Sequence, residues 1–136
     1  MGKGKDTASA TARACPCGGG DYANCCAPFH RGALPETALQ LMRARYSAYA
    51  LDELDFVHRT WDETTRPDLA DLHADEGGKW LGLEVRKHVA QQEQASVEFV
   101  ARYKAEGRAQ RIHEVSRFVR RHGQWFYVDG SFPKAK

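Results

Sequence analysis

The stretch ASVEFVARYKAEG, residues 95–107, decides the fold class of this chain. Its apolar side chains recur at every second position, as Val97, Phe99, Ala101 and Tyr103. Successive side chains of a β-strand point to opposite faces, so this alternation predicts a strand with one apolar face. A sheet that contains such a strand must bury the apolar face against another layer of structure.

Strand patterns continue on both sides of this stretch. WLGLEVRKHV (80–89) alternates in the same way, RIHEVSRFVRRHG (111–123) alternates less cleanly, and QWFYVDG (124–130) completes the series. Turn-forming residues separate these segments within AQQEQ, EGRA and HGQ. The second half of the chain is therefore predicted to form a long antiparallel meander.

Residues 34–76 carry a helical pattern instead. Apolar residues recur there at spacings of three and four, as Leu39, Met42, Tyr46 and Tyr49, and Pro35 fits a first helical position. A second short helix is expected after Asp52, and a third begins within TTRPDLADL (64–72). Three helices followed by an antiparallel sheet predict an α+β domain whose helices cover one concave sheet face.

The cysteines are confined to CPCGGGDYANCC, residues 15–26. They form two pairs, Cys15 with Cys17 and Cys25 with Cys26, separated by glycines that let the chain turn. Four thiolates are the number that a tetrahedral structural zinc site requires, so we predict one Zn²⁺. The alternatives are a redox pair, an iron–sulfur cluster, or zinc with His30 in place of one adjacent cysteine.

Composition and patterning bear on the compartment. The chain has 42% hydrophobic residues but no run of eighteen apolar residues, and residues 1–14 lack the apolar segment of a signal peptide. We therefore expect a cytoplasmic protein that does not insert into membranes and that begins with a flexible tail. A reducing cytosol favours metal-bound thiolates over disulfides.

The cysteine module resembles the SEC-C motif, a small zinc module known from the C-terminus of the SecA translocation ATPase, with its ligands at the four cysteine positions. The strings LMRARYSAYALDELDFVHRTW, WLGLEV, VEFVARYK and WFYVDG resemble the YchJ family of bacterial proteins. That family joins a SEC-C motif to a domain similar to nuclear transport factor two. The resemblance implies a tail (1–14), a zinc knuckle (15–30) and a cone-shaped α+β domain (31–132).

Charge is distributed unevenly along the chain. Residues 31–78 carry ten acidic and five basic side chains, whereas residues 79–136 carry six acidic and twelve basic ones. The two halves can simply attract each other, or the second half can present a basic face to RNA, such as a ribosome. The arginines that would form this face are Arg102, Arg108, Arg111, Arg117, Arg120 and Arg121.

Candidate acid–base residues for a cone-shaped active site are His58, Asp62, Glu98, His113 and Glu114. His113 and Glu114 are neighbours on one predicted strand and must point to opposite faces. We expect the acidic and imidazole groups to lie on different faces, so that no acid and base converge on one substrate atom.

The sequence therefore favours a zinc-containing binding or adaptor protein over an enzyme. The SEC-C resemblance implies a protein partner linked to translation, secretion or protein quality control. The alternative is a small-molecule enzyme of isomerase or dehydratase type that uses the cone. We also expect residues 31–130 to have a core separate from the knuckle, and so to stay folded without zinc.

Overall fold

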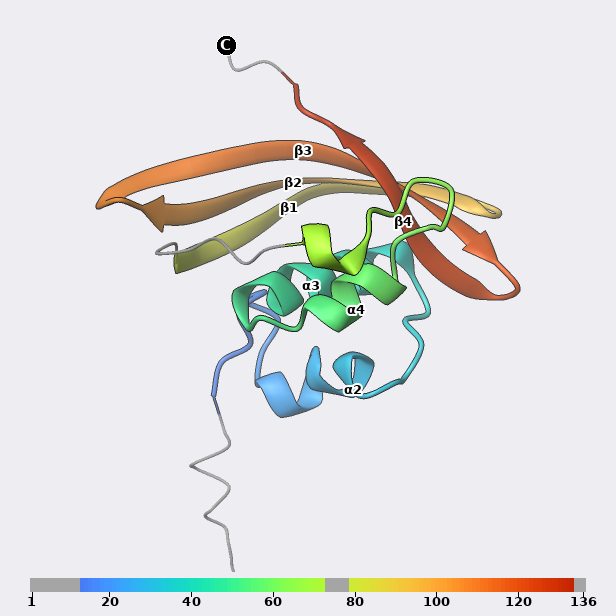
Figure 1. The fold of residues 1–136 in the computed structure, drawn as a ribbon, viewed down its shortest axis with the longest axis horizontal. Helices are drawn as coiled ribbons and strands as arrows, with labels where there is room; N and C mark the ends of the chain where they lie inside the picture. The colour runs from blue at the N-terminus through green and yellow to red at the C-terminus, as the bar shows by residue number, and fades with distance from the viewer. Residues whose placement is uncertain (1–12, 73–78, 134–136) are drawn as a thin grey trace, which may run out of the picture.

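The sheet is the largest element of the computed structural model, which describes residues 13–72 and 79–133. It is four-stranded and antiparallel, in the order β1 (Lys79–Gln91), β2 (Gln94–Ala105), β3 (Arg108–Arg121) and β4 (Gln124–Ser131). The helices lie together on one side of this curved sheet (Figure 1). The predicted α+β class and the antiparallel meander are confirmed.

Two of the hairpin turns explain the simple strand order. Glu106 and Gly107 connect β2 to β3 with φ angles of 53° and 76°, and His122 and Gly123 connect β3 to β4 with 53° and 79°. Positive φ at both central residues is the signature of the tight turn whose twist matches that of paired strands. Each turn therefore returns the chain directly alongside the preceding strand.

The first long helix begins later than predicted. Helix α3 (Ala38–Ala50) starts after Thr37, whose hydroxyl accepts a 3.0 Å hydrogen bond from the Gln40 amide, so Pro35 precedes the helix. Helix α4 (Leu54–Arg59) follows as predicted. No helix within residues 13–72 and 79–133 has the length and apolar character needed to cross a membrane.

The third predicted helix is only a single 3₁₀ turn, η2 (Leu69–Asp71), within the described residues. The carboxylate of Asp62 accepts hydrogen bonds from Thr64, and the Thr65 hydroxyl donates to the Val128 carbonyl at 2.7 Å. These contacts hold the chain in a turn, and Pro67 disfavours helical backbone at the residue before it. Residues 73–76, the end of the predicted helical region, lie outside the described residues.

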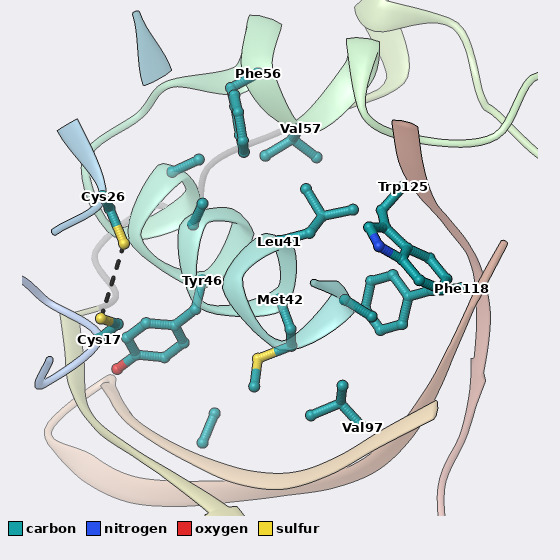
Figure 2. Close-up of a cluster of buried hydrophobic side chains, with 14 of the residues drawn as sticks. Cys17, Cys26, Leu41, Met42, Tyr46, Phe56, Val57, Val97, Phe118 and Trp125 are labelled. Atoms are coloured by element: carbon teal, nitrogen blue, oxygen red, sulfur yellow. Dashed lines mark hydrogen bonds between the residues drawn. The ribbon is translucent and has the colours of Figure 1, made fainter. Parts of the chain in front are cut away.

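One hydrophobic cluster surrounds α3. In Figure 2, Leu41 and Met42 of α3 lie between Phe118 and Trp125 on one side and two cysteines on the other. The cysteine module adds a 3₁₀ turn, η1 (Tyr22–Asn24), and a short helix, α2 (Ala27–His30), on the side of α3 away from the sheet (Figure 1).

The expectation of a separate core is therefore wrong. Cys15, Cys17 and Cys26 are at most 3% exposed and belong to the same cluster as the apolar residues of α3. The reason is that α3 is buried on two sides: Ala44 and Ala48 are completely buried although the sheet covers only one face of the helix. The knuckle and the domain share α3.

Candidate metal centre and cone pocket

The four cysteine sulfurs gather at one point, and all lie within 4.8 Å of one another. The Sγ–Sγ distances are 3.5 Å for Cys17 and Cys25, 3.9 Å for Cys25 and Cys26, and 3.8 Å for Cys17 and Cys26. Cys25 is partly exposed and the other three are buried. Four free thiols packed this closely could hold a metal ion.

The backbone of the Cys15–Gly20 loop makes this convergence possible. The Cys15 amide donates to the Gly20 carbonyl at 2.7 Å, and the Gly18 amide donates to the Cys15 carbonyl at 2.9 Å. Gly18 and Gly20 have φ angles of 83° and 127°, which L side chains rarely adopt. Gly19 is required for another reason, because a Cβ there would lie 2.9 Å from the Cys25 sulfur.

Helix α3 provides polar contacts to the cysteine cluster. The completely buried Ser47 hydroxyl lies 3.2 Å from the Cys15 sulfur and 3.3 Å from the Cys26 sulfur. Arg43 donates to the Cys17 carbonyl at 3.0 Å. Contacts of this kind orient metal ligands, and a nearby cation offsets the negative charge that thiolates bring.

The thiols strongly affect one another's protonation. A hydrogen bond from Cys26 lowers the pKa of Cys17, and burial raises the pKa of Cys25. The hydrogen bond to Cys17 also raises the pKa of Cys26. One thiolate thus forms at the expense of its neighbours, and a bound cation would stabilise the charged form of the others.

His30 has a different role from that of a fourth ligand. Its Nδ1 lies 2.7 Å from the Tyr22 hydroxyl, and its Nε2 lies 2.9 Å from the Ala44 carbonyl. A carbonyl only accepts, so Nε2 carries a proton, while Nδ1 is paired with the Tyr22 hydroxyl. Both ring nitrogens are occupied, and His30 instead ties α2 to α3.

A second candidate site lies between α3 and the sheet. This cone pocket has a volume of about 130 Å³. Apolar and aromatic side chains make up most of its wall, and the charged residues that line it are Arg45 and Glu114. The Glu114 carboxylate accepts hydrogen bonds from Ser116 at 2.7 Å and from Tyr127 at 3.1 Å. Sequence reasoning missed Arg45, although it interrupts the apolar stripe of α3 between Met42 and Tyr49.

The other acid–base candidates do not line the cone pocket. Glu98 and His113 form a 2.7 Å hydrogen bond, so the expectation that the acidic and imidazole groups lie on different faces is wrong for this pair. Strand register is the reason: Val100 lies opposite His113, which places Glu98 on the diagonal of the same face. That face points away from α3, because Glu98 alternates with the core residue Val97.

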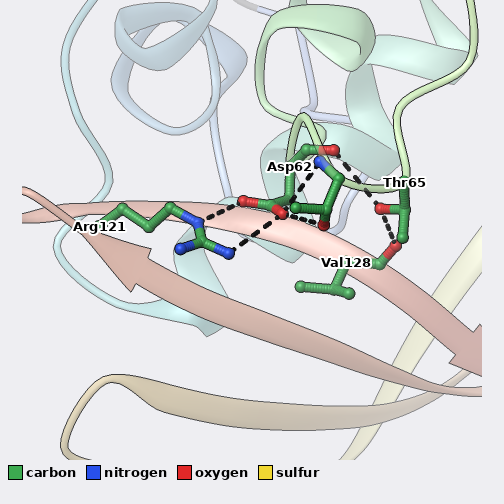
Figure 3. Close-up of polar contacts among 5 residues, drawn as sticks. Asp62, Thr65, Arg121 and Val128 are labelled. Carbon is green, nitrogen blue, oxygen red and sulfur yellow. Dashed lines mark hydrogen bonds and ion pairs between the residues drawn. The ribbon is translucent and has the colours of Figure 1, made fainter.

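Asp62 and His58 are also outside the pocket. Asp62 is 1% exposed, and its Oδ1 accepts a 2.6 Å hydrogen bond from Arg121 Nε (Figure 3). This hydrogen bond lowers the pKa of Asp62, because it stabilises the charged form. Asp62 thus connects the chain after α4 to the β3–β4 hairpin. His58 lies half-buried in α4.

Most of the predicted basic face is paired with acidic side chains. Four of the six arginines have carboxylate partners: Arg102 with Glu84, Arg117 with Asp129, Arg120 with Glu93, and Arg121 with Asp62. Arg108 and Arg111 have no ion pair among residues 13–72 and 79–133. Of the predicted patch, only these two side chains lack an acidic partner among the described residues, and they point to opposite faces of the sheet because they are three positions apart on β3.

Together, the fold and the cysteine cluster define a class: a four-cysteine knuckle packed on an α+β cone. Residues 37–130 match the family described as YchJ, middle NTF2-like domain. A UPF0225 protein of Ralstonia nicotianae is 53% identical over 135 residues, covering 90% of this chain and 94% of its own length. Another, from Cupriavidus metallidurans, is 54% identical over 124 residues, covering 85% and 86%. The chain belongs to the YchJ family.

Two solved structures have the same fold. The solution structure of a SEC-C motif containing protein from Rhodopseudomonas palustris matches with a TM-score of 0.78 and 30% identity, over 90% of this chain and all of that one. The crystal structure of another, from Psychrobacter arcticus, matches with a TM-score of 0.74 and 26% identity, over 93% and 86%. Each match therefore extends over at least 90% of this chain.

Proposed function

We propose that Cys15, Cys17, Cys25 and Cys26 bind one structural Zn²⁺. The observation that carries this proposal is the spacing of the sulfurs. A tetrahedral zinc ion with Zn–S bonds of about 2.3 Å has its sulfurs about 3.8 Å apart. The three short distances here are 3.5, 3.8 and 3.9 Å. The cluster fits a single tetrahedral ion with little rearrangement.

The same spacing argues against the alternative of an iron–sulfur cluster. In an iron–sulfur cluster the cysteines bind different iron atoms across the cluster, whereas these sulfurs are within 4.8 Å of one another. Four protein thiolates also leave no open coordination position, which is the arrangement of structural and not catalytic zinc. Zinc here would neutralise the thiolates and fix the knuckle against α3.

At the level of the whole protein, we propose a cytoplasmic, zinc-stabilised binding or adaptor protein. A reducing compartment is where clustered thiolates are expected to bind a metal and not to form disulfides, which supports a cytoplasmic location. Glu98, His113, Asp62 and His58 lie outside the cone pocket, which leaves the acid–base chemistry of an isomerase with little support. A protein partner linked to translation, secretion or protein quality control remains our expectation.

One observation favours the alternative of a small-molecule enzyme. Glu114 lies in the pocket wall, and Tyr127 and Ser116 donate to the same carboxylate oxygen, Oε2. A carboxylate oriented in this way can accept a proton from a bound substrate. Turnover of a panel of ketone and hydroxy compounds by the wild-type protein, abolished in Glu114→Gln, would favour the enzyme over the adaptor.

The zinc proposal is tested by elemental analysis of protein purified under reducing conditions. We expect one zinc per chain, and its loss in the double variant Cys15→Ser, Cys17→Ser. His30→Gln is the matched control: it alters a residue of the same module that we exclude as a ligand, and it should retain one zinc. Purified wild-type protein without zinc, or with iron in its place, would contradict the proposal.

The nucleic-acid version of the partner proposal is tested by ribosome co-sedimentation at low salt. Reversing Arg108 and Arg111 to glutamate should reduce binding, since these side chains lack acidic partners in the described residues. Reversing Arg117 and Arg120, which are already paired with carboxylates, changes the net charge equally and should reduce it less. Equal losses, or no co-sedimentation, would leave a protein partner of the knuckle as the better account.

A further inference from the structure

Arg45 is a buried cation beside a cavity. Its side chain extends from α3 into the wall of the cone pocket and is only 6% exposed. Nη1 donates to the Val57 carbonyl at 2.8 Å and to the Thr60 hydroxyl at 2.9 Å. The guanidinium carbon also lies 4.3 Å from the centre of the Tyr127 ring. These partners are neutral and use only part of the donor capacity of the guanidinium.

The positive charge of Arg45 has no ion-pair partner within residues 13–72 and 79–133. Glu114 lines the same pocket, but its carboxylate is held by Ser116 and Tyr127 and not by Arg45. A buried charge is costly unless it is paired, and the planar guanidinium fork matches the geometry of a carboxylate. The arrangement therefore suits an external anion that completes the pairing.

The other lining residues and the volume of the pocket indicate the size and the apolar character of the rest of that anion. Tyr49, Trp80 and Phe99 are among its aromatic walls. Its volume, about 130 Å³, is close to that of an apolar cavity of about 150 Å³ that accommodates benzene. The pocket thus combines an apolar chamber with the unused donor capacity of the Arg45 guanidinium.

We propose that the cone pocket binds a small monocarboxylate whose apolar body is about the size of one six-membered ring. The carboxylate accepts hydrogen bonds from the Arg45 guanidinium, and the apolar body contacts the aromatic walls. Glu114 carries a like charge in the same pocket and weakens the binding of such an anion. The proposal does not involve the zinc ion, because no cysteine is among the described residues that line the pocket.

The test uses three probes of similar shape: benzoate, the uncharged benzamide and the positively charged benzylammonium. Each is titrated into zinc-loaded, ¹⁵N-labelled protein while the indole N–H signals of the tryptophans are followed. We expect benzoate to bind at least tenfold more tightly than either of the other probes. Glu114→Gln should tighten benzoate binding several-fold, because it removes the like charge and keeps the shape of the side chain.

Arg45→Met supplies the second arm, since it keeps a long apolar stem and removes the charge. It should reduce the affinity for benzoate to that for benzamide. Equal affinities of the wild-type protein for benzoate and benzamide, or a preference for benzylammonium, would overturn the proposal. If Arg45→Met fails to fold, the probe comparison and Glu114→Gln still decide, because neither depends on that variant.

Discussion

Ser47→Ala should weaken zinc binding without any change to the ligand set. The Ser47 hydroxyl is completely buried and lies 3.2 and 3.3 Å from the sulfurs of Cys15 and Cys26. In the metal-bound state it donates to a thiolate, and in the metal-free state it contacts a neutral thiol. A hydrogen bond to a charged group contributes about 1.5–3 kcal/mol, against about 0.5–1.5 kcal/mol for a neutral one.

The difference between these two hydrogen-bond energies sets the expected effect of Ser47→Ala on zinc affinity. It amounts to about 1–1.5 kcal/mol, which corresponds to about a fivefold to tenfold loss of affinity at about 1.4 kcal/mol per decade. In other proteins, removing a hydrogen-bond partner of a metal ligand lowers metal affinity or activity about 10–100-fold, and the lower end of that range agrees with this value. Competition with a chromogenic chelator measures it directly.

Ser116→Ala is the matched control for this measurement. Ser116 is 2% exposed and its hydroxyl also has a hydrogen-bond partner, the partly buried Glu114, but it lies in β3 and not in the cysteine module. Both variants should lower the free energy of unfolding, and only Ser47→Ala should lower the zinc affinity. Unchanged affinity in Ser47→Ala, or an equal loss in both variants, would refute the role assigned to the hydroxyl.

Three further predictions concern the cysteine cluster and the hydrogen bond between Asp62 and Arg121. Chelating the zinc should lower the urea midpoint of the whole domain, followed by circular dichroism, because the knuckle shares α3; an unchanged midpoint would restore the idea of a separate core. Gly19→Ala places a Cβ 2.9 Å from a ligand sulfur and should reduce zinc content by elemental analysis, whereas Gly82→Ala, which meets nothing within 4 Å, should not. Asp62→Asn should cost about 1–3 kcal/mol in urea unfolding, because it weakens the bond to Arg121. The pKa of Asp62 is lowered in the folded protein. Ionised Asp62 therefore stabilises the fold fully above its unfolded-state pKa of about 3.9, and this stabilisation is lost as the pH falls through the lower folded-state pKa. Unfolding of Asp62→Asn should lack this dependence on acid pH.

The sequence alone predicted the features that depend on neighbours along the chain. Alternation in residues 95–107 reports directly on side-chain direction in a strand, and the Glu106–Gly107 turn fixes an antiparallel neighbour. The cysteine pairs are separated by only seven residues, so their convergence needs a local loop and no long-range contact. The α+β class and the possibility of a metal site were therefore readable before the structure.

Only the tertiary structure decided which distant side chains meet. Alternation gives the face of a residue, but the register between β2 and β3 decides that Glu98 meets His113. The pairing of Arg121 with Asp62 spans 59 positions, and no local pattern encodes it. Arg45 appears in the sequence as one of two arginines on α3, and its burial follows from the packing of α3 between the sheet and the knuckle. Local periodicity sets each element, whereas contacts between elements set the charge of the pocket and the surroundings of the thiols.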